Sequence, residues 1–277
     1  MTEEWLSEYG LKAGVCESSY HADTGSLSST GARKILACPA RFKWERDHPP
    51  APTTKAFDFG KLSHKLVLGE GSAIQIVEAD NWLSKAAKEQ RDAARADGAV
   101  PVLRSEYDAA KAMRQAVMAH PVAGALFTTG SAELSGYWQD EPTDIRLRFR
   151  PDWLTGHTNR VTCVDYKSTI SANPDEFVRS VARYGYHQQA AWYLDGLAAN
   201  GLTDARFLFV AAEKTPPHPV SVIELDDEAI AEGRRLNRLA IDTYARCMDT
   251  GIWPAYGDDI TLISLPYWAL PELEISL

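Results

Sequence analysis

Two aspartates and a lysine stand at the ends of two neighbouring strand-like segments of the chain. Asp152 follows one segment of alternating apolar residues, Asp165 ends the next, and Lys167 comes two residues later. Side chains two apart on a strand point to the same face, so Asp165 and Lys167 are expected to project together. A hairpin turning at 156–159 would bring Asp152 beside them. Two carboxylates and an ammonium group could then hold a divalent metal ion and activate water against a phosphodiester.

Aspartate and lysine at strand ends are also common as solvated surface residues, so this pattern needs support from other positions. Glu133 alternates with two serines on the polar side of a strand predicted over 131–139. If that strand pairs with one over 144–152, Glu133 lies on the same sheet as Asp152. It would then offer a carboxylate for a second metal ion or for a water. The alternative is a solvated strand glutamate.

A histidine and a glycine share a helix predicted over 59–68. His64 lies four residues after Gly60. A neutral imidazole suits Mn²⁺ and is tolerated beside carboxylates that hold Mg²⁺, although a single helical histidine is more often structural. A glycine inside a helix costs about 1 kcal/mol relative to alanine, so Gly60 indicates a close approach of another backbone.

The predicted strand over 144–152 carries a dense basic face. Its alternation fits a half-buried strand with a solvated basic side, and this explains the pattern fully. Alternatively the basic side runs beside Asp152, and Arg148 and Arg150 contact phosphates, whereas Arg146 is plain surface. The apolar side consists of Ile145, Leu147 and Phe149, and the basic side of Arg146, Arg148 and Arg150.

Gln189 and Tyr193 lie four residues apart on a helix predicted over 185–198, which places them on one face. Ordinary packing of an aromatic helix would account for this spacing. In a site, Gln189 could bond the attacking water or the region of Lys167, and Tyr193 could contact a DNA backbone. Earlier in the chain, Ser28 is predicted to cap the N-terminus of a helix over 31–36.

Composition limits the class of protein. The 277 residues are 45% hydrophobic, which is enough for one large domain or two small ones. No apolar stretch has the length of a transmembrane helix and the start is acidic, so a cytoplasmic protein is expected. The four cysteines contain no Cys-x-x-Cys pair, which argues against a zinc or iron–sulfur site and is consistent with a reducing compartment. The net charge of −9 argues against coating of nucleic acid by bulk electrostatics, but not against a DNA enzyme.

The order of predicted elements indicates one α/β or α+β domain with a helical N-terminal part. Helices come first, and a group of strands, two helices, two further strands and a long helix follow. The predicted strands are 131–139, 144–152, 161–168, 206–212 and 219–224, and the later helices are 173–182, 185–198 and 226–247.

Together these motifs resemble one family. Gly60-x-x-x-His64, Glu133, Arg150-Pro151-Asp152, Asp165-Tyr166-Lys167 and Gln189-x-x-x-Tyr193 occur in the order of the RecB-like branch of the PD-(D/E)XK nucleases. The flanking residues, among them Tyr20-His21-Ala22, Tyr186-His187 and Leu265-Pro266-x-Trp268, are similar to the RecE-type (exonuclease VIII) nuclease domain of phages. The resemblance covers about 20–268, so 1–277 is expected to be a single domain. Ala32 departs from the family, where a larger apolar residue is expected.

The resemblance implies an α/β fold, with a central mixed sheet flanked by helices. It implies a Mg²⁺-dependent 5′-to-3′ exonuclease on double-stranded DNA ends, with Mn²⁺ as a substitute, that leaves 3′ overhangs for recombination with a RecT-like single-strand annealing protein. The metal ligands that it implies are His64, Asp152, Asp165 and the Tyr166 carbonyl. Lys167 positions or deprotonates the attacking water. Glu133 serves a second metal ion or orients the water, and Gln189 holds the substrate together with Tyr193. The DNA contacts are Arg148, Arg150, Tyr193 and, for a 5′-phosphate, Ser28 and Thr30.

The resemblance also implies a toroidal oligomer, with a tetramer as the expected state. Enclosing DNA would let an acidic protein remain on its substrate, and the aromatic tail over 253–268 could supply a contact between protomers. Alternatively the tail covers its own core. A structure- or site-specific endonuclease, or a non-catalytic protein that binds DNA ends, are the other functions compatible with this fold.

Overall fold

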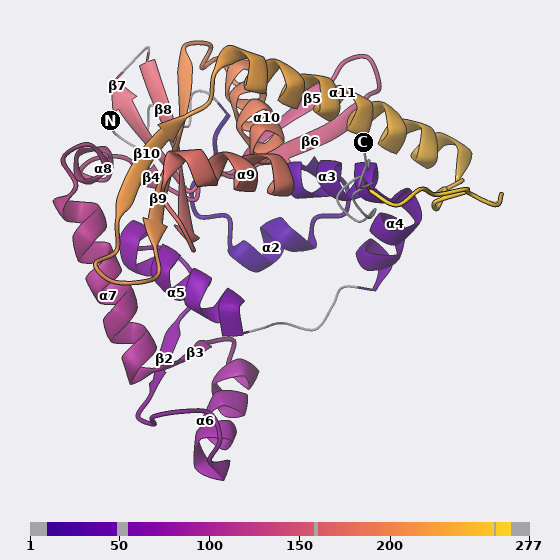
Figure 1. Ribbon diagram of the computed structural model, residues 1–277. Coiled ribbons are helices and arrows are strands. Elements are labelled where there is room, and N and C mark those ends of the chain that lie inside the picture. Colours follow the sequence, from indigo (N-terminus) through magenta and orange to yellow (C-terminus); the bar gives the residue numbers. More distant parts are fainter. Residues whose placement is uncertain (1–9, 49–54, 158–159, 258, 267–277) are drawn as a thin grey trace, which may run out of the picture.

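The computed structural model describes residues 10–48, 55–157, 160–257 and 259–266. Its centre is a five-stranded sheet in the order β10-β9-β8-β7-β4, in which β8 and β9 are parallel and the other pairs are antiparallel (Figure 1). These strands are β4 Ser131–Ala132, β7 Trp153–His157, β8 Arg160–Thr169, β9 Ala205–Glu213 and β10 Val220–Glu224.

The remaining strands of the described chain form two smaller sheets. One has the order β1-β6-β5, with β1 parallel and β5 antiparallel to β6. The other is the parallel pair β2-β3, which projects with α6 away from the main sheet (Figure 1). The bounds are β1 Leu27–Ser28, β5 Gly136–Asp140, β6 Ile145–Phe149, β2 Ile74–Val77 and β3 Val100–Leu103.

Helices cover both faces of the central sheet, as Figure 1 shows. One face is covered by α3 Ser29–Ala37, α9 Pro174–Tyr184, α10 Tyr186–Ala199 and α11 Asp227–Thr250. The other is covered by α5 Lys55–Leu68, α7 Arg104–Ala119 and α8 Pro121–Leu126. The remaining helices are α2 Glu17–Ala22, α4 Pro39–Asp47 and α6 Lys85–Ala96.

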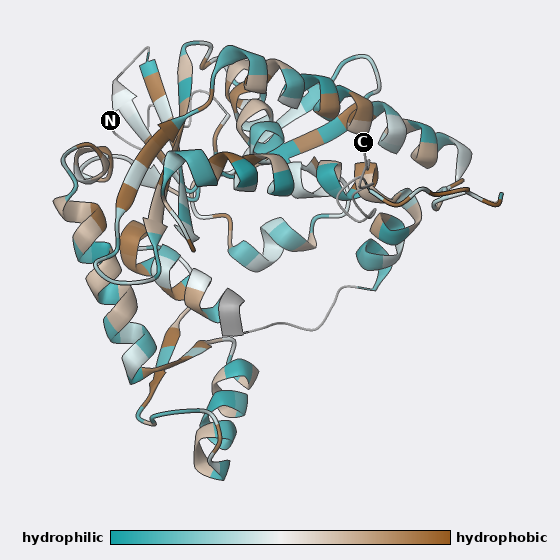
Figure 2. Cartoon of the chain, in the orientation of Figure 1, coloured by the Kyte–Doolittle hydropathy of each residue, from teal (hydrophilic) through white to brown (hydrophobic). Residues whose placement is uncertain are grey.

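Successive residues of β8 point alternately into the two hydrophobic cores on either side of the central sheet. Cys163 belongs to the core under α10, whereas Val164 and Tyr166 belong to the core under α5 and α7. Because alternate residues face opposite sides, Asp165 falls on the α10 side with Cys163. The strands of the central sheet are largely hydrophobic, and the outlying α6 is mostly hydrophilic (Figure 2). No helix among the described residues has the length and apolarity that a membrane span requires.

The mixed sheet flanked by helices confirms the predicted fold class, but two strand predictions are wrong in part. The segment over 131–139 is split between two sheets, because Glu133 adopts φ +54° between β4 and β5. The strand over 144–152 ends at Phe149, and Pro151 lacks the N–H that a continuing ladder would need. The antiparallel partner of β8 is therefore the short β7, which the sequence pattern did not predict.

The other predicted elements are confirmed within a few residues, including the Ser28 cap, whose Oγ accepts from Gly31 N–H at 3.1 Å. The sequence pattern did not predict α2, β3 or α8. In the tail, Trp253 packs on Phe42, with ring centroids 6.0 Å apart, so this part of the tail covers its own core. Asn159 of the predicted turn and Trp268 of the tail lie outside the described residues.

Candidate active site

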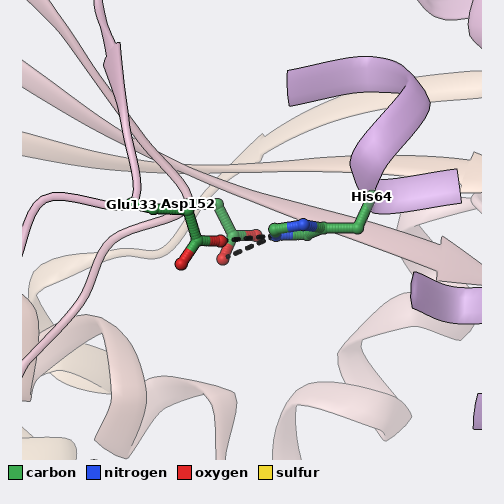
Figure 3. A group of neighbouring side chains, drawn as sticks. All are labelled: His64, Glu133 and Asp152. Carbon is green, nitrogen blue, oxygen red and sulfur yellow. Dashed lines mark ion pairs between the residues drawn. The ribbon is translucent and has the colours of Figure 1, made fainter. Parts of the chain in front are cut away.

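Three side chains from three separate segments converge at one end of the central sheet (Figure 3). His64 comes from α5, Glu133 from the link between β4 and β5, and Asp152 from the residues before β7. The Nε2 atom of His64 lies 3.2 Å from Asp152 Oδ1 and 3.5 Å from Glu133 Oε1. One ligand atom from each residue lies within 4.8 Å of the others, so the group could bind one metal ion.

The backbone holds the two carboxylates in place. The left-handed conformation of Glu133 redirects the chain, and its N–H donates to the carbonyl of Asp152 at 3.2 Å. Asp152 in turn accepts at Oδ2 from the N–H of Tyr166, at 2.8 Å. This bond holds Asp152 against β8, the strand that carries Asp165. The expected approach of Asp152 to that strand is therefore confirmed. A non-glycine residue at positive φ is uncommon and is often found at functional sites.

The charges of this group favour a cation at its centre. Burial alone would lower the pKa of His64, but Asp152 and Glu133 raise it to about 9. Burial and the charge of Asp152 raise the pKa of Glu133 to about 7, against the opposing effect of His64. Burial acts to raise the pKa of Asp152, yet His64, Lys167 and the Tyr166 N–H hold it below its usual range. The carboxylates therefore stabilise positive charge beside them.

Asp165, Lys167 and Gln189 form a second group on the α10 side of β8. Lys167 Nζ pairs with Asp165 Oδ1, which confirms that the two side chains project together. Gln189 Nε2 donates to Asp165 Oδ2 at 2.5 Å, and Lys167 Nζ lies 3.4 Å from Gln189 Oε1. Burial, opposed by Lys167, raises the pKa of Asp165 to about 6. Burial opposes the charge of Lys167, but Asp165 and Asp152 raise its pKa.

Tyr186 is a site residue whose role the sequence pattern did not reveal. Its ring centroid lies 4.9 Å from Lys167 Nζ, a distance suited to a cation–π contact. The Tyr-Gly-Tyr sequence at 184–186 marks a helix junction but carries no signal for this contact. Tyr166 uses its hydroxyl to bond Ser63, at 2.7 Å, so its side chain fixes α5 against β8.

Arg148 and Arg150 do not form an exposed basic face, contrary to expectation. They are only 7% and 8% exposed, because the N-terminal segment around α2 covers them. Arg148 donates to the carbonyl of Ser26 at 2.8 Å, and Arg150 donates to that of Val15. Both guanidinium groups lie over the ring of Tyr20, at 5.1 and 4.4 Å from its centroid. They hold this segment on the sheet, and their contact with DNA stays a prediction.

A cleft of about 1750 Å³ opens in front of the three converging side chains. Its lining also includes Tyr193 and, at the N-terminus of α3, Ser28, Ser29 and Thr30. Ser28 is engaged as the helix cap, and Thr30 Oγ1 accepts from Arg33 at 3.2 Å. The hydroxyl of Ser29 is buried, lines the cleft and has no hydrogen-bond partner in the described structure. The predicted DNA-contacting residues, including the two buried arginines, thus all line one cavity.

Gly60 also lines the cleft. The expectation that another backbone segment approaches this glycine closely is wrong. A Cβ atom at Gly60 would meet no atom of the described residues within 4 Å, apart from its chain neighbours and its own helix backbone. No other backbone of the described chain approaches this side of α5. The missing side chain instead leaves open space one turn before His64.

The residues present fit a hard divalent cation. Two carboxylates and one imidazole form a donor set suited to Mg²⁺ or Mn²⁺. Asp165 stands outside this group, which differs from the predicted ligand set, because Lys167 and Gln189 engage its carboxylate. Its Oδ1 contacts Lys167 without a hydrogen bond of regular geometry and so retains free lone pairs. When bound, a divalent ion supplies Lewis-acid polarisation and activation of a water molecule.

Comparison with known proteins identifies the family of this chain. Residues 28–266 match the family described as a PDDEXK-like domain of unknown function (DUF3799), so the chain belongs to that family. No curated protein is similar enough to count as a match. The fold is therefore that of a PDDEXK-like domain, the class of the PD-(D/E)XK nucleases.

A solved structure shows the same fold at low sequence identity. A presumed exonuclease from Eubacterium rectale has a TM-score of 0.62 and 11% identity, over 92% of this chain and 97% of that chain. An alkaline exonuclease from Laribacter hongkongensis has a TM-score of 0.37 and 14% identity, over 90% of this chain and 96% of that chain.

Proposed function

We propose that the protein is a Mg²⁺-dependent exonuclease that degrades double-stranded DNA from its ends in the 5′-to-3′ direction and leaves 3′ overhangs. One observation carries the proposal: His64, Glu133 and Asp152 meet in an open cleft beside the Asp165–Lys167 pair. Carboxylates and a lysine at the end of a sheet are the groups that metal-assisted phosphodiester hydrolysis needs. The family match and the exonuclease-like fold support the same reaction.

Each residue has a role in this proposal. His64, Glu133 and Asp152 hold Mg²⁺, and Asp165 and the Tyr166 carbonyl complete the set when the ion is present. Lys167 positions the attacking water and offsets the charge that develops on the phosphate. Gln189 fixes Asp165 and Lys167 relative to one another, since it bonds the first and lies within 3.4 Å of the second. Tyr193 contacts the DNA strand in the cleft.

The N-terminus of α3 is the proposed site for a 5′-phosphate. Free N–H groups and the helix dipole favour an anion at this position. The buried, unpartnered hydroxyl of Ser29 is one donor available to it, and the hydroxyls of Ser28 and Thr30 lie beside it. A requirement for this phosphate would make the enzyme begin at DNA ends.

The proposal extends to assembly and partners. We propose that the protein forms a ring that encloses DNA, with a tetramer as the expected state. The ring works in the bacterial cytoplasm with a RecT-like single-strand annealing protein. The tail supports a protomer contact, because Ile260 and Leu262 are 102% and 96% exposed and have no cover within the described chain. Light scattering at micromolar protein tests the ring, and a strictly monomeric protein that digests long duplexes without dissociating would contradict it.

The test of the reaction uses linear duplex DNA labelled at either its 5′ or its 3′ ends. We expect early release of the 5′ label, late release of the 3′ label and no attack on a covalently closed circle. Early release of the 3′ label would reverse the polarity. Cutting of the circle would favour a structure- or site-specific endonuclease on the same fold, and tight end binding without cleavage would favour a non-catalytic protein.

A further inference from the structure

Lys214 is a basic residue of the cleft that the proposed reaction leaves unused. The other lysines and arginines that line the cleft are engaged within the protein: Lys34 with Glu45, Arg46 with Asp47, Lys61 with Glu17, and Arg148 and Arg150 with backbone carbonyls. Lys214 also lines the cleft, but in the described part of the chain its ammonium group has no hydrogen bond or ion pair. Its ammonium group instead approaches the ring of Phe59, whose centroid lies 6.0 Å from Nζ. Lys214 therefore offers a cation to a ligand.

The backbone holds Lys214 in a fixed place. Its N–H donates to the carbonyl of Thr169 at 3.0 Å, where β8 and β9 end side by side. The preceding Glu213 donates to the carbonyl of Pro219 at 2.9 Å and accepts from the N–H of Ala172 at 2.9 Å. Because these bonds fix the start of the β9–β10 connection, only the lysine side chain must be ordered when it binds a ligand.

The open side of α5 lies along the same cleft. Phe59, which Lys214 approaches, is followed directly by Gly60. A methyl group in place of the glycine hydrogen there would have no atom of the described residues within 4 Å, apart from its chain neighbours and the backbone of α5 itself. His64 follows one helical turn later. Lys214 and the bare helix surface at Gly60 thus border the cavity next to the metal-binding group. A nucleic acid strand with a phosphate at His64 would have room for its neighbouring backbone here.

We propose that Lys214 and the open face of α5 at Gly60 form a binding site for a backbone phosphate of the cleaved strand, at a position other than the scissile phosphate. The inference rests on the proposed function. A lysine on a flexible stem binds phosphate as a point charge and reads no base, which suits an enzyme that must move along any sequence. In a protein of net charge −9, a cation that is free among the described residues of the cleft has a large share of the attraction for DNA.

Binding of a linear DNA duplex, measured by fluorescence anisotropy in EDTA over a series of salt concentrations, tests the site. EDTA prevents cleavage, so the readout is independent of catalysis. Lys214→Gln is expected to weaken binding at low salt. It should also reduce the slope of log K against log salt by roughly 0.7 to 0.9, the value for one lost phosphate contact. Lys214→Arg should restore the slope. The matched control is Lys111→Gln, which removes one charge from the exposed surface of α7 outside the cleft.

The outcomes separate this site from the proposed function. A wild-type protein that neither binds nor cleaves DNA would remove the proposed function and, with it, this site. A wild-type protein that binds and cleaves DNA, while Lys214→Gln keeps the same salt slope as Lys111→Gln, would overturn the Lys214 site alone. Thermal melting of each variant checks that the fold is retained, which we expect because the Lys214 ammonium group bonds to nothing in the described residues.

Discussion

Replacing Gly60 with alanine should make the protein more stable and less active. The position lies inside α5, and in the described part of the structure a Cβ there meets no atom within 4 Å beyond its chain neighbours and the helix backbone. The substitution therefore gains the full helix preference of alanine over glycine, about 1 kcal/mol, with no steric cost. In a protein of this size that gain raises Tm by about 2 °C. The added methyl group would meanwhile occupy the space proposed for the substrate backbone.

The expected loss of activity follows from geometry. A substrate displaced by about 1 Å can lose about 100-fold in rate, so a decrease of about 10- to 100-fold in kcat/KM is expected. Thermal melting by circular dichroism and initial rates of nucleotide release measure the two effects. Gly233→Ala in α11 is the control with the opposite sign, because its Cβ would lie 2.3 Å from the carbonyl oxygen of His187 and should lower Tm. A lower Tm for Gly60→Ala, or full activity, would refute the reasoning.

Three further substitutions test individual roles. Asp165→Asn keeps the shape of a buried side chain and should abolish cleavage while the circular dichroism spectrum stays unchanged; wild-type rates in the folded variant would remove Asp165 from the site. Lys167→Ala should leave DNA binding largely intact and lower the cleavage rate by roughly two to four orders of magnitude, as measured under single-turnover conditions. His64→Ala should shift the Mg²⁺ titration of activity to higher concentration, with partial recovery in Mn²⁺; an unchanged titration with a lower Tm would make His64 a packing residue.

The sequence predicted the parts of the site that depend on strand periodicity. Asp165 and Lys167 are two residues apart on a regular strand, so their contact follows from the two-residue repeat. The spacing of Gln189 and Tyr193 likewise follows from a regular helix. Hydrophobic alternation and the long helical segments were also sufficient to give the fold class.

Other features depend on irregular backbone and long-range packing, which no local pattern encodes. The positive φ of Glu133 carries the chain from one sheet to another and turns its carboxylate towards His64. Arg148 and Arg150 alternate as a solvated face would, but a segment more than one hundred residues away in the sequence covers them. Lys214 belongs to no sequence motif. Only the structure shows that it is free to bind a ligand while the other lysines and arginines of the cleft are engaged.

The most direct test of the metal-dependent nuclease assignment is the initial rate of nucleotide release from linear duplex DNA as a function of Mg²⁺ concentration. We predict no release in EDTA, saturable activation by Mg²⁺, and loss of that activation in Asp152→Asn, which alters a carboxylate at the centre of the proposed site. Release that persists in EDTA, or a folded Asp152→Asn variant that retains the wild-type response to Mg²⁺, would contradict the assignment.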